Sequence, residues 1–434
     1  MNEGFLVRTY KKYISSEFLK NSSILIITTF LAQLITLGFS PLLGRLYSPE
    51  QVGVYSLCFS VVTIVGAVAT LRYELSIVLP KDNEDAKVLF LSSLLIAIVI
   101  TLLYLIIGSG VFLLNKDGFF AKMDYVSILL IAMGILLMGI NQSMNYLCIR
   151  LKKFKLNGLA RLLVSFTTAL IIVFLGYFWG GQYQFLLIAF IISQFLGAVL
   201  YWICLPKEFF SEVNIFNKYE SIKTLLKKHR SFAFINTPHV LFDGVQENSV
   251  IFLFGYFFSA KVVGWYSFAY RLLKAPVGLV GNAFYNVFYQ RMAEKHSKGI
   301  SIMSDVKRMY KTLLMFGLPC FLLAFFMIPF IFEFLFGSKW IEAGIIAQIM
   351  VPWLFLNFMA SPVSSIVVIL NKQKGAFLFT IVDFFFKVVA ILIGKYFNSY
   401  KLALYIMTFG SSLVMVAGLI WYYRLAKSTQ LSTI

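Results

Sequence analysis

The stretch Ser48–Ser56 has the sequence SPEQVGVYS, and Ser259–Ser267, 211 residues further on, has the sequence SAKVVGWYS. Five of the nine positions are identical, and each copy opens an apolar run long enough to cross a membrane. The spacing is close to half the length of the 434-residue chain. An internal repeat of this period indicates two related halves, and a turn followed by a helix start is expected at each copy.

Composition gives the broad class of the chain. Hydrophobic residues make up 60% of it and charged residues 13%, and its mean hydropathy is +0.83. Soluble domains carry about 25% charged residues. No polar block is long enough to fold as a separate soluble domain. We therefore expect an all-α integral membrane protein.

Apolar runs of about 20 residues, the length of a membrane-spanning helix, occur twelve times. Six precede the polar stretch Lys207–Arg230 and six follow it, which agrees with the repeat. Polar residues interrupt the seventh and eighth runs. The expected organisation is a six-helix bundle at 1–206, a cytoplasmic linker at 207–231 and a second six-helix bundle at 232–434. The runs are Asn21–Leu43, Gln51–Leu71, Val88–Leu114, Tyr125–Ile149, Gly158–Trp179, Gln184–Leu205, Phe232–Phe258, Val262–Gln290, Leu313–Phe336, Ala343–Leu370, Gly375–Phe397 and Lys401–Tyr423.

Lysine and arginine are unevenly divided between the two sides of the predicted membrane. With the N-terminus in the cytoplasm, the cytoplasmic segments carry 28 of these residues and the opposite loops carry 7. The positive-inside rule then places both termini in the cytoplasm. The same bias accounts for the net charge of +19 as a topology signal, so a nucleic-acid surface is not indicated.

The seventh run carries His239, Asp243 and Glu247 at intervals of four, hence on one helix face. Two carboxylates one turn apart in a low-dielectric setting disfavour double ionisation. Such a pair suits a site that couples transport to a proton or another cation. The alternative is that these groups form structural ion pairs with basic residues of neighbouring helices.

The eighth run carries Arg271 and Lys274 on one helix face, with Tyr270 and Asn282 nearby. Cations held within a membrane suit phosphate groups or acidic sugars, and Arg can bind two oxygens at once. Here the alternative is a pair of salt bridges to the carboxylates of the seventh run.

Two further sets of polar residues lie within the runs. Asp383 and Lys387 have i, i+4 spacing, which favours an ion pair within one helix over a substrate role. Asn141, Gln142 and Asn145 on the fourth run are candidates for lining the cavity from the first half, although polar residues also pack helices together.

Three elements carry a resemblance to a known family: Leu43–Tyr55 with its SPEQVGVY turn, Leu71–Glu74 (LRYE) leading to Val78–Pro80, and Tyr266–Pro276 with Arg271. With its two six-helix halves, the chain resembles bacterial lipid-linked oligosaccharide flippases of the Wzx type. These belong to the polysaccharide transporter branch of the MATE-like (MOP) superfamily.

The resemblance implies two pseudo-symmetric bundles that form a V-shaped cavity and open alternately to each side of the bacterial cytoplasmic (inner) membrane. The implied cargo is a polyprenyl-diphosphate-linked glycan, such as an O-antigen repeat unit, whose lipid tail stays among the membrane lipids. A proton or sodium gradient, rather than ATP, would drive the transport. A polysaccharide polymerase and chain-length machinery are the implied partners.

The resemblance and the residue patterns together give a set of expected roles, with no catalytic residue, metal or cofactor. Arg72 and Glu74 match the family pattern at the cytoplasmic end of the second run, where they are expected to act as a gate or a loop anchor, with cargo contact as the alternative. The expected substrate-binding residues are Arg271, Lys274, Asn141, Asn145, Tyr270, Asn282 and Lys387, and the expected ion-coupling residues are Asp243, Glu247 and Asp383.

Three other classes of function are the alternatives to a flippase. A MATE-like multidrug or organic-cation antiporter shares the architecture, but its cavity is expected to be anionic or apolar. A membrane scaffold for glycan assembly needs no charges in a cavity. An enzyme is not indicated, because the chain has no Walker phosphate-binding loop and no large outward loop.

Overall fold

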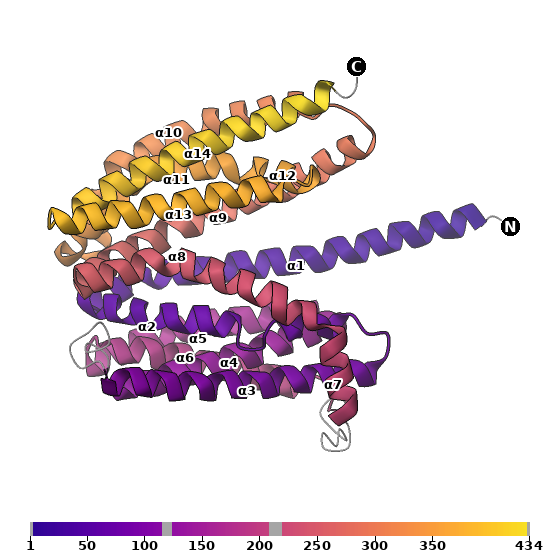
Figure 1. The fold of residues 1–434 in the computed structure, drawn as a ribbon, viewed down its shortest axis with the longest axis horizontal. Coiled ribbons are helices and arrows are strands. Elements are labelled where there is room, and N and C mark those ends of the chain that lie inside the picture. Colours follow the sequence, from indigo (N-terminus) through magenta and orange to yellow (C-terminus); the bar gives the residue numbers. More distant parts are fainter. Residues whose placement is uncertain (1–2, 115–123, 208–218, 432–434) are drawn as a thin grey trace. The chain divides into compact units, whose positions relative to one another are not determined.

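The computed structural model describes residues 3–114, 124–207 and 219–431, which fold as helices joined by short connections (Figure 1). Each of the twelve predicted runs lies largely in helical structure, although the helix of the second run ends at Ala67, four residues before the predicted end. The first half contains α1 (Glu3–Leu46), α2 (Pro49–Ala67), the short 3-10 helix η1 (Tyr73–Val78), α3 (Asn83–Leu114), α4 (Tyr125–Arg150), α5 (Phe154–Trp179), α6 (Tyr183–Cys204) and α7 (Tyr219–Lys228).

The second half begins with the π-helical turn η5 (Phe232–Asn236). It continues through α8 (Thr237–Phe257), α9 (Ala260–Ser297), α10 (Met303–Phe336), the 3-10 turn η6 (Ser338–Trp340), α11 (Ile341–Val363), α12 (Ser365–Ile369), α13 (Gln373–Tyr396) and α14 (Tyr400–Leu431).

Contacts divide the chain into two compact units. Unit 1 comprises residues 1–47 and 57–248, and unit 2 comprises residues 48–56 and 249–434. The start of α2 therefore belongs to unit 2, although the rest of that helix belongs to unit 1. The domain boundaries expected from the sequence, 1–206, 207–231 and 232–434, stay a prediction.

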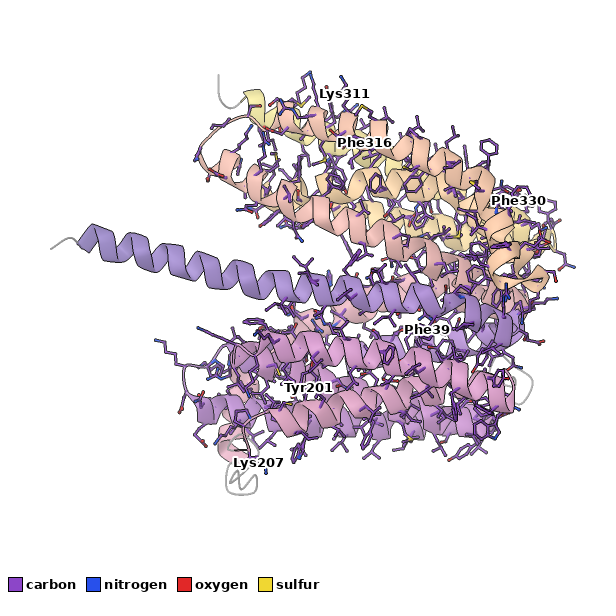
Figure 2. All side chains as sticks on the ribbon, turned by 180° about the vertical axis from the view of Figure 1, so that it is seen from behind. Phe39, Tyr201, Lys207, Lys311, Phe316 and Phe330 are labelled. Carbon is purple, nitrogen blue, oxygen red and sulfur yellow. The ribbon has the colours of Figure 1, made fainter. Side chains whose placement is uncertain are left out.

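Ten helical segments in the described part of the chain are long and apolar enough to span a membrane, which makes this a multi-pass membrane protein. Large apolar side chains cover their outer surfaces. On α10, for example, Phe316 and Phe330 are 64% and 71% exposed (Figure 2), as expected of a face that contacts lipid. The predicted seventh and eighth spans form α8 and α9, which are not among the ten because their polar residues lower the hydropathy.

The two copies of the repeat begin their helices in the same way, as predicted. The hydroxyl of Ser48 accepts a hydrogen bond from the backbone N–H of Gln51 at 3.3 Å, and the hydroxyl of Ser259 accepts one from Val262 at 3.3 Å. A serine hydroxyl at this position satisfies an N–H that the first helical turn leaves unpaired. Both serines therefore cap their helices.

The copies also pack against each other inside unit 2. A β-carbon added to Gly53 would lie 1.7 Å from the carbonyl oxygen of Ala260, and one added to Gly264 would lie 1.7 Å from that of Pro49. Adding 211 to the glycine's residue number in the first contact and subtracting 211 from its partner's gives the second contact, so the two helix starts cross about a local two-fold axis. Only glycine fits at this crossing. The hydroxyls of Ser56 and Ser267, also 211 residues apart, lie 2.8 Å apart at the same crossing.

Each unit has its own apolar core. In unit 1, α7 packs through Leu225 on a cluster that includes Phe90 and Leu147, so part of the predicted linker is folded onto the bundle. In unit 2, the Phe268 and Trp340 rings lie 4.2 Å apart. The helices of each unit are thus held by packing rather than by the loops.

Candidate functional site

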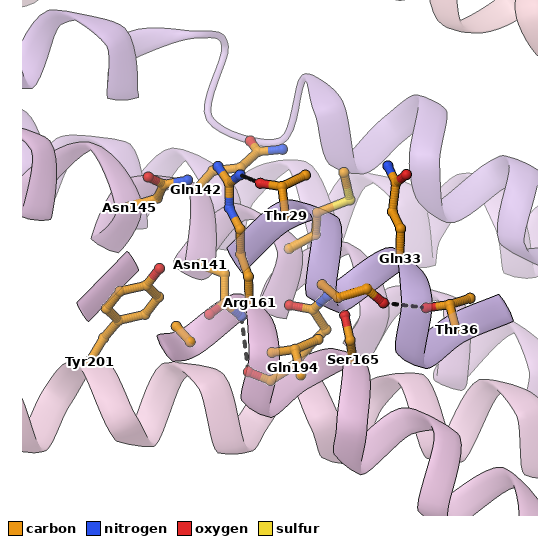
Figure 3. Close-up of a pocket in the computed structure, with 14 residues that line it drawn as sticks. Thr29, Gln33, Thr36, Asn141, Gln142, Asn145, Arg161, Ser165, Gln194 and Tyr201 are labelled. Atoms are coloured by element: carbon orange, nitrogen blue, oxygen red, sulfur yellow. Dashed lines mark hydrogen bonds between the residues drawn. The ribbon is translucent and has the colours of Figure 1, made fainter. Parts of the chain in front are cut away.

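A polar pocket of about 370 Å³ lies between four helices of unit 1, α1, α4, α5 and α6 (Figure 3). Ligand pockets in proteins run from about 300 to 1,000 Å³, so this pocket has room for part of an oligosaccharide. Ten of its fourteen lining residues carry a hydroxyl, amide or guanidinium group, while most of the exposed wall surface is apolar. Its lining residues are Thr29, Ala32, Gln33, Thr36, Met138, Asn141, Gln142, Asn145, Ala160, Arg161, Val164, Ser165, Gln194 and Tyr201.

Two of the predicted cavity residues, Asn141 and Asn145, lie in this pocket one turn apart on α4. The Asn141 amide donates to the carbonyls of Leu137 and Gln194, each at 2.9 Å. The side-chain oxygen of Asn145 accepts a hydrogen bond of 2.8 Å from the Asn157 amide. Both side chains are therefore held in place, and part of their polar capacity is used in packing α4 against α5 and α6.

Arg161 carries the only charge among these lining residues, all of which the structure describes. Its guanidinium donates to the hydroxyl of Thr29 on α1 at 2.8 Å. No carboxylate within the described residues forms an ion pair with it. A guanidinium offers five donors, so most of its donor capacity is available to a ligand.

Two acceptors complete the pocket. The side-chain carbonyl oxygens of Gln33 and Gln142 are buried and have no hydrogen-bond partner in the described part of the chain. Buried polar atoms without partners are uncommon in proteins, and each calls for an explanation. A hydroxyl-bearing ligand would supply the donors that these two oxygens lack.

A second cluster lies in unit 2 and brings together four of the predicted site residues. The rings of Tyr270 and Trp353 stack with their centroids 6.3 Å apart. The Lys274 ammonium lies 5.1 Å from the Tyr270 ring centroid, and the Lys387 ammonium lies 5.6 Å from that of Trp353. Lys387 also forms the predicted i, i+4 ion pair with Asp383, at 2.6 Å. The result is an aromatic platform flanked on one side by the Lys274 ammonium and on the other by the Lys387–Asp383 ion pair.

The other predicted residues of α9 lie apart from this cluster. Arg271 is exposed, and among the described residues of its own unit it makes no hydrogen bond or ion pair. Asn282 lies within α9, but its side chain is outside the part that the structure describes. An apolar pocket of about 410 Å³, walled by α9, α10 and α11, lies further along the helix from Leu273 to Phe284.

On α8, the predicted common face is present. The imidazole of His239 lies 3.1 Å from the Asp243 carboxylate, and both side chains are more than half exposed. Glu247 lies one turn further along the same helix. Salt bridges from Asp243 and Glu247 to Arg271 and Lys274, the structural alternative to a substrate role, stay an untested hypothesis.

Arg72 and Glu74 lie at the start of η1, after the turn that follows α2, where Leu71 and Arg72 adopt left-handed backbone conformations with φ of 48° and 61°. Glu74 is fully buried, 3.0 Å from the Arg72 guanidinium, and its other oxygen accepts a hydrogen bond from Thr70. Burial raises the pKa of the Glu74 carboxyl, while Thr70 and Arg72 oppose that rise. A backbone bend and a buried ion pair thus coincide at one loop.

Sequence reasoning missed two arginines. Arg161 lies close after the basic loop residues Lys152–Lys155, and it was therefore included in the count of cytoplasmic lysine and arginine residues that gives the topology. Arg150, at the end of α4, donates to the carbonyls of Ile77, Pro80 and Asp82 at 2.8 to 3.2 Å. The sequence did carry a signal for Arg161 as a pocket residue, because Ser165 follows four residues later and a polar pair at this spacing lies on one helix face. For Arg150 there was none, because its partners are mostly backbone carbonyls distant in sequence.

Comparison with solved structures identifies the fold. The chain is similar to lipid II flippase MurJ in an inward closed conformation, with a TM-score of 0.72 and 14% identity over 94% of this chain and 90% of that one. It is also similar to an inward-facing multidrug resistance MATE family transporter of the MOP superfamily, with a TM-score of 0.68 and 14% identity over 93% of this chain and 96% of that one. For a MOP superfamily transporter from Pyrococcus furiosus, the TM-score is 0.56 and the identity 13%, over 95% of this chain and 96% of that one. The fold is therefore that of MOP superfamily transporters.

The family follows from the sequence. The model of the family described as "Polysaccharide biosynthesis protein" matches residues 42–345, and the chain belongs to this family. The match confirms the resemblance to the polysaccharide transporter branch of the superfamily. The family and the similar structures are those of transporters and flippases, not of enzymes. No curated protein matches the chain.

Proposed function

We propose that this protein translocates polyprenyl-diphosphate-linked oligosaccharide repeat units from the cytoplasmic to the outer leaflet of the bacterial cytoplasmic membrane, for O-antigen or another surface polysaccharide. It acts as a transporter of the Wzx type. Twelve spans, formed by the ten apolar helices together with α8 and α9, would make two pseudo-symmetric bundles around a V-shaped cavity that opens alternately to each side.

The observation that carries the proposal is the polar pocket of unit 1, which is cationic and rich in hydroxyl and amide groups although it lies between membrane-spanning helices. A charged residue within a membrane is costly and is retained where it serves a pathway or a partner. Sugars present many hydroxyls, and the lipid carrier presents a diphosphate. The chemistry of the pocket matches both.

The cluster of unit 2 supports the same cargo. Aromatic rings offer a flat apolar surface against which a sugar ring can pack, and Lys274 and Lys387 beside them suit the anionic groups of the cargo. In this proposal Arg271 and Lys274 receive the diphosphate or acidic sugars. Asn141, Asn145, Tyr270, Asn282 and Lys387 complete the set of cargo contacts.

Energy would come from an ion gradient. Asp243 and Glu247 are the proposed coupling residues, with Asp383 in a secondary role and a proton or sodium as the coupling ion. Arg72 and Glu74 would hold the loop after α2 as a gate or an anchor at the cytoplasmic end. The excess of lysine and arginine supports a topology with both termini in the cytoplasm. A polysaccharide polymerase and chain-length machinery are the proposed partners.

Deletion of the gene tests the proposal. We expect loss of one surface polysaccharide, together with accumulation of its complete repeat unit on the lipid carrier, and sugar analysis of that pool would identify the cargo. The intact gene should restore both. A double deletion with any second flippase gene of the same strain controls for overlapping function. Normal surface glycan without lipid-linked accumulation in the double mutant would contradict the proposal.

The MATE-like multidrug alternative gives a different result. Its substrates are organic cations, which the Arg161 guanidinium would repel rather than attract. Cells that carry the gene on a plasmid should therefore show no added export of cationic dyes. Dye export that disappears on deletion would favour the multidrug alternative.

A further inference from the structure

Arg161 is the one charged residue among those that line the pocket of unit 1. It is exposed, its one hydrogen bond goes to the neutral hydroxyl of Thr29, and no described carboxylate pairs with it. Thr29 in turn donates its proton to the carbonyl of Leu25 at 2.7 Å, so its oxygen is free to accept from Arg161. The hydroxyl thus orients the guanidinium without neutralising it.

The neighbouring groups point to a hydroxyl-bearing ligand rather than a simple ion. The side-chain carbonyl oxygens of Gln33 and Gln142 lack donors, although both are buried. Sugar hydroxyls are donors that fit these acceptors, whereas an inorganic anion would be repelled by them. Ser165, one helical turn from Arg161, and Tyr201 add hydroxyls that both donate and accept.

The wall also excludes a cation as the ligand. Neutral oxygens from Gln33, Gln142 and Thr36 could contact a metal ion, but the guanidinium of Arg161 shares the same cavity of about 370 Å³. Within that volume its positive charge would oppose a second cation. A ligand that combines a negative charge with several hydroxyls satisfies the acceptors and the guanidinium together.

We infer that this pocket is a binding subsite for an oxyanion-bearing part of the glycan cargo. Arg161 pairs with the oxyanion, and Gln33 and Gln142 accept hydrogen bonds from sugar hydroxyls beside it. The oxyanion is the carboxylate of an acidic sugar or the diphosphate that joins the glycan to its lipid. This inference rests on the proposed function, and it adds a recognition site in unit 1 whose key residue the sequence did not single out.

Binding to two matched probes tests the inference. The full chain in lipid nanodiscs is titrated with a polyprenyl-diphosphate-linked disaccharide that ends in glucuronic acid, and with the same lipid ending in glucose. The two probes differ only at C6 of the last sugar, which is a carboxylate in glucuronic acid and a hydroxymethyl group in glucose. Wild-type protein is compared with Arg161→Gln, which removes the charge, with Arg161→Lys, which keeps it, and with Thr29→Val, which removes only the orienting hydrogen bond. Lys155→Gln removes an exposed charge two turns away on α5 and is the matched control.

The expected result is a loss of affinity of roughly tenfold or more for Arg161→Gln, as for a hydrogen bond to a charged group. Loss for the glucuronic acid probe alone would assign the site to an acidic sugar, and equal loss for both probes would assign it to the diphosphate. Arg161→Lys should retain part of the affinity. Gln33→Leu and Gln142→Leu should lower the affinity for both probes by similar factors, since both probes carry sugar hydroxyls. Lys155→Gln should bind as wild type does.

Two outcomes overturn the inference, and they are distinguishable. If wild type and Arg161→Gln bind both probes equally well, the subsite is wrong while the proposed function stands. If folded wild-type protein, checked by its thermal unfolding, binds neither probe, then the proposed function fails and the subsite fails with it. Should Arg161→Gln not fold, the Gln33 and Gln142 variants carry the test, and unchanged affinity in both would contradict the inference.

Discussion

At the scale of single residues, Gly53 and Gly264 show how a nine-residue match becomes a structural constraint. They hold the same position in the two copies of the repeat, and each faces a carbonyl oxygen of the other copy. A methyl group at either site would require the helices to move apart. The identity of the two glycines across 211 residues therefore has a steric cause.

We expect Gly53→Ala and Gly264→Ala each to destabilise the protein by about 1–3 kcal/mol, the usual range for overpacking. The thermal unfolding temperature of the purified protein measures the change. Gly38→Ala is the matched control, because nothing lies within 4 Å of its added β-carbon, and alanine favours a helix. Equal unfolding temperatures for all three variants would show that the crossing is looser than described.

Arg271 gives the opposite expectation, a change in function without a change in stability. Because it is exposed and makes no ion pair or hydrogen bond among the described residues of its own unit, Arg271→Ala should abolish export of the glycan while membrane abundance stays near that of wild type. Immunoblots of membranes and assays of surface polysaccharide measure the two. Arg424→Ala, an exposed arginine of α14, is the control. Disappearance of Arg271→Ala from the membrane would instead support a salt-bridging, structural role.

The sequence predicted some site residues better than others. Asp383 and Lys387 were expected to pair because their partner lies four residues away, and the pair is present. Asn141 and Asn145 were expected to line a cavity from their polarity alone; they line the pocket within unit 1, and their contact with cargo stays a prediction. The role of Arg161 depends on α1, α4 and α6, which pack around it, and this packing cannot be predicted from the sequence near Arg161.

At the scale of elements, the helices follow directly from the apolar runs, because a chain in lipid must satisfy its backbone hydrogen bonds internally. The connections do not follow in this way. The loop from Ile77 to Asn83 is fixed by Arg150, whose guanidinium also donates to the Asn83 side chain at 3.0 Å. The packing of α7 against the other helices of unit 1 likewise depends on tertiary contacts, which cannot be predicted from the polar sequence of α7.

Arg150→Ala should therefore loosen one loop. Hydrogen bonds to charged groups contribute about 1.5–3 kcal/mol, so we expect a loss of stability of that order and faster proteolytic cleavage between α2 and α3. Limited proteolysis of the purified protein, followed by mass spectrometry, locates the cut. Lys155→Ala, an exposed substitution on α5, should leave the cleavage pattern unchanged. A wild-type pattern in Arg150→Ala would show that the buried Glu74 pair alone holds the loop.

At the scale of the whole molecule, the family match and the MOP fold agree with the composition, the repeat and the apolar runs. The features that set α8 and α9 apart from the ten apolar helices are their charges, which are also the main functional candidates. This is the expected pattern for a transporter, because a residue that serves cargo or a coupling ion lowers the hydropathy of the helix that carries it. The chemical identity of the cargo depends on side chains brought together by folding.

Coupling belongs to this scale because it links an ion gradient to movement of the whole chain. Asp243→Asn and Glu247→Gln should each weaken gradient-dependent transport in reconstituted vesicles, since an amide cannot release a proton or carry a negative charge. Glu294→Gln, a change at an exposed carboxylate near the end of α9, is the control. Unaltered transport in both single variants, at equal protein content, would remove these residues from the coupling role.

The most direct test of the central claim is transport of a lipid-linked glycan by the purified protein. Vesicles are prepared with a polyprenyl-diphosphate-linked oligosaccharide, and a membrane-impermeant glycosidase reports how much of it reaches the outer leaflet over time, with an ion gradient applied. We predict that wild-type protein increases the accessible fraction well beyond protein-free vesicles and that Arg271→Ala does not. Equal accessibility with and without wild-type protein, in vesicles where the protein is shown to be folded and inserted, would contradict the account.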